Sequence, residues 1–136
     1  MELDVFKYRD ELKLRTKQFV LRVVKLYQSL SKTTEAQIIG KQLFRSGTSV
    51  GANYRAACRA RSNAEYYSKI SIVIEEADET MFWLEVLWES NIVKQKLLQS
   101  LYNENEEMLK IMVISRKNSE KNKFNHSVTQ LFSYSS

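Results

Sequence analysis

The chain contains no proline in 136 residues and only three glycines, and all three glycines fall between positions 40 and 51. Proline interrupts helices, and strand-rich or α/β folds depend on turns that contain glycine and proline. This distribution therefore favours long, uninterrupted helices joined by short polar segments. At about 100–200 residues per domain, the length corresponds to a single domain. One cysteine cannot form an internal disulfide, which is typical of a reducing compartment.

Apolar residues recur at three- and four-residue spacing, and capping signals divide the chain into four helical stretches. Thr34 with Gln37 fits a capping box before the second stretch, and Ser62 with Glu65 fits one before the third. The expected helices cover residues 5–30, 35–59, 62–89 and 94–118. Three short connections between them predict an all-α fold, an antiparallel up-down-up-down four-helix bundle over residues 1–119. Residues 120–136 are rich in Asn, Ser and Lys, and we expect a loosely ordered polar tail there.

The three glycines lie inside the second expected helix, where each costs about 1 kcal/mol relative to alanine. At 100° per residue, Gly40, Gly47, Gly51 and Cys58 fall within a strip of about 40°. A strip of small side chains lets a neighbouring helix approach closely, which recovers packing contacts. The alternative is a break or kink of the helix between Gly47 and Gly51.

One segment resembles a catalytic motif. Gly47-Thr48-Ser49-Val50-Gly51 matches the G-x-S-x-G nucleophile elbow of serine hydrolases. That chemistry needs a strand before the serine and a histidine base. Here the preceding residues are helical, and the only histidine, His126, lies in the expected tail. Because the acidic residues of the third helix are scattered round its axis, they are not focused on one cation. We therefore expect no catalytic residue, no metal and no cofactor, and a protein that is not an enzyme.

The hydropathy pattern indicates where in the cell the protein is expected. No apolar run approaches the roughly 18 residues of a membrane span. The first four residues include two acidic ones, Glu2 and Asp4, and carry no signal-peptide core. The expectation is a cytoplasmic protein without a membrane partner.

The net charge of +5 is unevenly spread along the chain. Residues 1–61 carry 13 Lys and Arg against 5 Asp and Glu, whereas residues 62–93 carry 1 against 7. Such asymmetry indicates an anionic partner for the basic part or charge pairing between helices or between copies of the chain.

The second expected helix carries most of the informative basic residues. Within an arc of about 80°, it presents one lysine and three arginines, and a further arginine follows in the next connection. We call these five residues the basic stripe: Lys41, Arg45, Arg55, Arg59 and Arg61. Arginines grip phosphates bidentately, so the stripe predicts binding to RNA or DNA. The alternative is that it pairs with the acidic third helix, in a protein-interaction scaffold that binds no nucleic acid.

The third expected helix is apolar on more than one side. One face suits the bundle core, and a second set lies elsewhere on the helix. The expected core positions are Tyr66, Ile70, Val73, Ala77, Leu84 and Leu87. We call this second set the apolar patch: Ile72, Phe82, Trp83 and Val86. In a bundle of this size it predicts an interface with another copy of the chain. A wide stripe within a monomer core is the alternative.

Two segments, Gln42–Ser62 and Lys69–Thr80, together with Trp83-Leu84, resemble a family of small bacterial four-helix-bundle proteins. The family is also known as the proteins encoded by intervening sequences in 23S ribosomal RNA genes. Many relatives carry proline and an Asn-x-x-Glu-Gly pattern here, whereas this chain has Gly51 and Asn53-Tyr54-Arg55-Ala56, like one subgroup.

The resemblance implies an antiparallel four-helix bundle that assembles as a homopentamer and has no catalytic residues. More distantly, the family is similar to the accessory protein of diversity-generating retroelements, which binds nucleic acid and a reverse transcriptase. A protein partner is therefore also an expectation. The ribosomal part of the family name reflects gene location.

Overall fold

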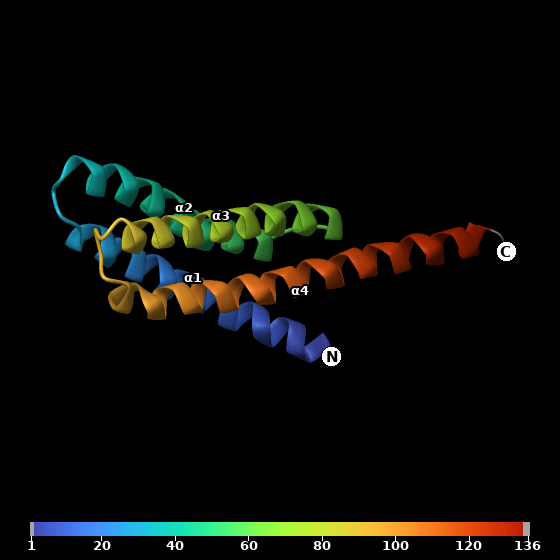
Figure 1. Ribbon diagram of the computed structural model, residues 1–136. Helices are drawn as coiled ribbons and strands as arrows, with labels where there is room; N and C mark the ends of the chain where they lie inside the picture. The colour runs from blue at the N-terminus through green and yellow to red at the C-terminus, as the bar shows by residue number, and fades with distance from the viewer. Residues whose placement is uncertain (1, 135–136) are drawn as a thin grey trace.

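Four helices make up the computed structural model of the chain. They are α1 (Glu2–Ser29), α2 (Thr34–Cys58), α3 (Asn63–Glu89) and α4 (Gln95–Tyr134). The backbone is described for residues 2–134 and the side chains for residues 8–120. Consecutive helices run in opposite directions and pack along their length (Figure 1). The all-α antiparallel four-helix bundle is confirmed, and residues 2–134 contain no strand.

The connections are short and are fixed by local hydrogen bonds. At the start of α3, the backbone N–H of Glu65 donates to Ser62 Oγ over 3.1 Å, which is the expected cap. At the start of α2 the N-cap is Thr33, one residue earlier than the sequence indicated, and its side chain makes no capping bond. There the Gln37 side-chain amide donates to the Ser31 carbonyl over 2.8 Å instead.

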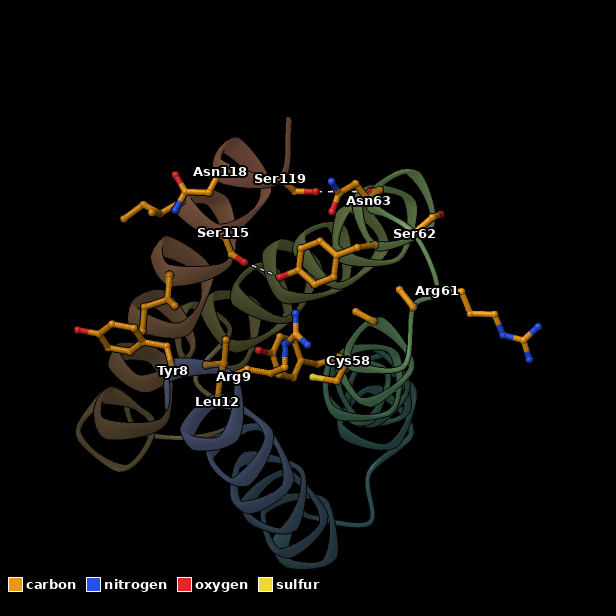
Figure 2. A pocket seen from close by; sticks show the side chains of 16 residues that line it. Tyr8, Arg9, Leu12, Cys58, Arg61, Ser62, Asn63, Ser115, Asn118 and Ser119 are labelled. Carbon is orange, nitrogen blue, oxygen red and sulfur yellow. Dashed lines mark hydrogen bonds between the residues drawn. The ribbon is translucent and has the colours of Figure 1, made fainter. Parts of the chain in front are cut away.

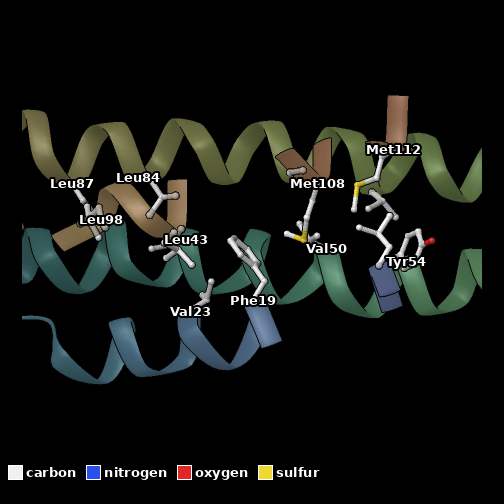
Figure 3. Packing of buried hydrophobic residues seen from close by; sticks show 14 of the residues in the cluster. Phe19, Val23, Leu43, Val50, Tyr54, Leu84, Leu87, Leu98, Met108 and Met112 are labelled. Atoms are coloured by element: carbon white, nitrogen blue, oxygen red, sulfur yellow. The ribbon is translucent and has the colours of Figure 1, made fainter. Parts of the chain in front are cut away.

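The core lies along the axis between all four helices, and the apolar periodicity predicted most of it. On α3 the expected core positions Ile70, Val73, Ala77, Leu84 and Leu87 are fully buried. Figure 3 shows side chains from each helix converging on the same interior. The other large contributors are Phe19, Val23, Leu43, Val50, Leu98, Met108 and Met112.

The glycine strip packs against α1, as the sequence predicted. A β-carbon on Gly47 would lie 2.9 Å from Val23 Cγ2, and one on Gly51 would lie 2.7 Å from Val20 Cγ2. Both separations are shorter than real β-carbon contacts, so α1 sits where only glycine fits. The alternative of a break is wrong, because α2 is one continuous helix from Thr34 to Cys58.

Each helix also buries a polar side chain within the bundle: Thr16, Ser46, Thr80 and Asn105. Thr80 Oγ1 lies 3.0 Å from Ser46 Oγ and ties α3 to α2. The Asn105 side-chain amide donates to the Ala77 carbonyl over 2.8 Å and ties α4 to α3. These contacts satisfy the Thr80 and Ser46 hydroxyls and the Asn105 amide N–H, whereas the buried Asn105 Oδ1 has no partner among the described residues.

The fourth helix ends later than the sequence pattern predicted. Its backbone is helical to Tyr134 rather than to residue 118, and it projects past the other three helices (Figure 1). Ser119 is still buried, and its hydroxyl donates to the Asn63 carbonyl over 3.4 Å. The expected polar tail of residues 120–136 falls almost wholly outside the described side chains.

Candidate nucleic-acid interface

The basic stripe follows the outer face of α2 toward one end of the bundle. Lys41, Arg45 and Arg55 belong to the helix, Arg59 is its C-cap, and Arg61 lies in the connection to α3. All five side chains are exposed. The helical arc derived from the sequence is therefore present on the surface.

Arg45 differs from the other members of the stripe because it pairs with α3. Its Nη2 lies 2.5 Å from Glu79 Oε1, and its Nη1 lies 3.3 Å from Glu76 Oε2. The hydrogen bond from Arg45, reinforced by one from Trp83, lowers the pKa of Glu79 below its usual value. The Arg45 side chain nevertheless remains 49% exposed.

The other four cations of the stripe have no ion pair among the described side chains. Their charges face solvent, on the side of α2 away from the core. The backbone at Arg61 is held by a local hydrogen bond, in which the Glu65 carboxylate accepts the N–H of Arg61 over 3.1 Å. That bond holds the backbone of the connection and leaves the Arg61 guanidinium outside.

A cleft of about 690 Å³ opens at the end of the bundle where the stripe finishes. It lies where α1 and α4 separate, and all four helices contribute to its walls (Figure 2). An ion pair from Arg15 to Glu104 joins α1 and α4 nearer the middle of the bundle. Beyond that pair the two helices diverge toward the end where α1 begins (Figure 1).

Aromatic and polar side chains surround the cleft. The hydroxyls of Tyr66 and Ser115 form a short hydrogen bond across it, and the Arg9 guanidinium lies 5.9 Å from the centre of the Tyr66 ring. Tyr8 is 55% exposed at its edge. Burial raises the pKa of Tyr66 and that of the Cys58 thiol, so both groups are neutral at pH 7.

The cleft was missed by sequence reasoning, which took Tyr66 as core and Cys58 as a structural thiol on the glycine strip. Both side chains do pack against the core, but each also lines the cleft. Periodicity finds the faces of helices and not the angle at which two of them separate.

The apolar patch lies on the side of α3 that also carries Glu79. Ile72 and Phe82 are exposed, the latter by 54%, whereas Trp83 and Val86 are half-buried. The Phe82 and Trp83 rings meet edge to face, with 4.9 Å between centroids. The Trp83 indole N–H donates to Glu79 Oε1 over 3.2 Å. The patch therefore adjoins the α2–α3 ion pairs.

The G-x-S-x-G segment does not form a nucleophile elbow. Ser49 of the G-x-S-x-G match lies inside α2, where its carbonyl accepts a bond from the Asn53 amide over 2.9 Å. The strand required before a nucleophile elbow is replaced by helix. No group of three or more potential metal ligands occurs among the described residues. No helix in that part of the chain is long and apolar enough to cross a membrane.

The fold and surface define an all-α, four-helix-bundle protein with a basic face on its second helix. The model of one family, described as 23S rRNA-intervening sequence protein, matches residues 11–114. The chain belongs to this family, as the resemblance predicted.

A solved structure agrees with that assignment. A protein of unknown function from the S23 ribosomal protein family of Bacteroides thetaiotaomicron is 34% identical to this chain and superposes with a TM-score of 0.75. The match covers 80% of this chain and 97% of that one. No curated protein matches the chain.

Proposed function

We propose that the chain is a non-enzymatic, homo-oligomeric four-helix bundle that binds RNA or DNA through the basic stripe. The observation that carries this proposal is that most side chains of the stripe are exposed and have no ion pair among the described residues. The side chains of Lys41, Arg55, Arg59 and Arg61 are exposed, and their charged groups form no ion pair within the described part of the chain. Cations left on one face in this way are available to phosphates.

The spacing of the stripe suits a nucleic-acid backbone. At a rise of 1.5 Å per residue, Lys41 and Arg55 are about 21 Å apart along α2. That distance spans about six nucleotides of one strand at 3.4 Å each. Four phosphate contacts give a slope of log affinity against log salt of about −3 to −4 for each protomer.

Self-association is the second part of the proposal, and the exposed apolar patch supports it. Large apolar side chains grouped on a surface are typical of protein contacts. An oligomer brings several stripes together and so raises the effective affinity for a long nucleic acid. The family resemblance makes five copies the expected number. Analytical ultracentrifugation tests this, and a mass of 16.0 kDa at micromolar concentration contradicts it.

Nucleic-acid binding is tested by titrating labelled single-stranded and duplex oligonucleotides at several salt concentrations. The double variant Arg55→Gln/Arg59→Gln is expected to make the salt slope shallower by about 1.4 to 1.8 per protomer. Lys96→Gln is the control, because Lys96 is an exposed cation on α4 away from the stripe. If the wild-type chain shows no salt-dependent binding near physiological ionic strength, nucleic-acid binding is wrong.

One observation favours the alternative, a scaffold without nucleic acid. Arg45 pairs with Glu76 and Glu79 of α3, so at least one member of the stripe serves the α2–α3 packing. Under this alternative the remaining cations contact acidic residues of another copy. Arg55→Glu then breaks the assembly, whereas under the nucleic-acid proposal it leaves the oligomeric mass unchanged and lowers oligonucleotide affinity.

A further inference from the structure

The end of the basic stripe coincides with the mouth of the cleft. Arg59 caps α2, and Arg61 lines the rim with its side chain pointing outward (Figure 2). A nucleic-acid strand that follows the stripe along α2 therefore arrives at the cleft with its phosphates still beside arginines. Its bases are then next to the opening.

The interior of the cleft has the chemistry of a base-binding site. Tyr8 and Tyr66 offer aromatic rings, and the Arg9 guanidinium already lies over one of them. The amide of Asn118, at the rim, makes no hydrogen bond with the described residues. The cleft is also lined by apolar side chains, among them Leu12 and Ile111. Bases stack on aromatic and guanidinium planes and pair through their edges with amides.

The charge and the size of the cleft further restrict the class of ligand that it can bind. Among the described residues its lining contains no Asp or Glu, and Arg61 lies at its rim, which favours an anionic ligand over a cationic one. Its volume of about 690 Å³ lies in the range of about 300–1,000 Å³ that is typical of small-ligand sites. A base inside a duplex is stacked and paired and must be extruded before it can enter.

We propose that this cleft receives an unpaired nucleobase, so that the protein prefers single-stranded or looped nucleic acid to duplex. The inference rests on the proposed function and names the form of nucleic acid that the same surface takes. The stripe binds the phosphates of single strands and duplexes alike. The preference for single strands comes from the cleft.

The single cysteine of the chain is a native reporter of the cleft. Cys58 is half-buried and lines the cleft wall, so it needs no engineering to be labelled there. The rate of its alkylation by iodoacetamide is measured by mass spectrometry on the full-length protein. This alkylation rate is compared among three samples: the protein alone, the protein saturated with a single-stranded 12-mer, and the protein saturated with a duplex of the same sequence. We expect the single strand to slow alkylation about tenfold, and the duplex to change it less than twofold.

A variant pair tests the same inference by affinity. Tyr8→Ala removes a stacking ring at an exposed position, and we expect it to lower single-strand affinity about tenfold while leaving duplex affinity unchanged. Tyr67→Ala is the matched control, since Tyr67 is an exposed tyrosine of α3 that does not line the cleft. Thermal melts of both variants confirm that the fold is retained.

The outcomes separate the inference from the proposed function. If Arg55→Gln weakens both oligonucleotides while Cys58 reacts equally fast in both complexes, the proposed function stands and the cleft inference is wrong. If Cys58 is protected simply by raising the protein concentration, a second copy of the chain covers the cleft and the inference is also wrong. If neither oligonucleotide binds, the proposed function fails and the cleft inference fails with it.

Discussion

The substitution Gly51→Ala tests the packing that shapes the basic face of α2. In an unobstructed helix interior, replacing glycine by alanine stabilises the fold by about 1 kcal/mol. Here the new β-carbon would meet Val20 Cγ2 at 2.7 Å and the carbonyl oxygen of Thr16 at 3.3 Å. The carbonyl belongs to the backbone of α1 and has no rotamer to move to. The Val20 side chain must therefore leave its rotamer, and α1 must also move slightly away from α2 to relieve the backbone contact.

The size of the effect follows from two opposing terms. Overpacking a well-filled interface costs about 1–3 kcal/mol, and the upper part of that range applies because backbone is involved. Subtracting the gain of about 1 kcal/mol in helix propensity leaves a net destabilisation of about 1–2 kcal/mol. For a chain of 136 residues this lowers Tm by about 4 °C for each kcal/mol.

Urea unfolding followed by circular dichroism at a fixed protein concentration measures the change, since assembly makes stability concentration-dependent. Ala52→Gly is the matched control: Ala52 is exposed on the same helix, so only the propensity term of about 1 kcal/mol is lost. Adding Val20→Ala to Gly51→Ala removes the closest contact, and the double-mutant cycle is expected to show a favourable coupling of about 1 kcal/mol. If Gly51→Ala raises stability by about 1 kcal/mol, the close approach of α1 and α2 is refuted.

Three further predictions concern the surface. Phe82→Glu places a charge in the apolar patch and is expected to lower the oligomeric mass in ultracentrifugation without changing the helical content. Ala52→Arg adds a cation between members of the basic stripe and should steepen the salt slope of oligonucleotide binding by about 0.7–0.9 per protomer. Arg45→Gln is expected to cost less than about 1 kcal/mol at pH 7, because the pair is partly solvated. The lowered pKa of Glu79 means that the contribution is present above the ordinary glutamate value of about 4.3, so wild type and Arg45→Gln should converge in urea midpoint as the pH falls below about 4.

The fold could be predicted from the sequence because its signals are local and repeated. The absence of proline and the three- and four-residue spacing placed four helices and most core positions, including Val73, Leu84 and Met112. The buried Thr80 and Asn105 could not be found in this way, because apolar periodicity assigns polar residues to the surface. The end of α4 was also missed, because the apolar pattern fades there while the backbone remains helical.

The candidate site could be predicted only in part. Helical geometry places residues on an arc, so the grouping of the stripe on one face of α2 followed from the sequence, whereas its exposure to solvent did not. The ion pairs of Arg45 depend on how α3 is rotated beside α2, and the cleft depends on the divergence of α1 from α4. Both are tertiary relations between separate helices, and no pattern within one helix contains them.

The arc also explains why Arg45 alone in the stripe is paired. Along α2, the core-facing side is flanked by α1 at the glycine strip and by α3 at Ser46. At 100° per residue, Arg45 lies about 40° round from Lys41 toward the α3 side, whereas Arg55 lies about 40° the other way. Only Arg45 is thus within reach of Glu76 and Glu79. The packing that anchors α2 on two sides therefore neutralises one edge of the stripe and leaves its centre, which leads to the cleft, exposed to solvent.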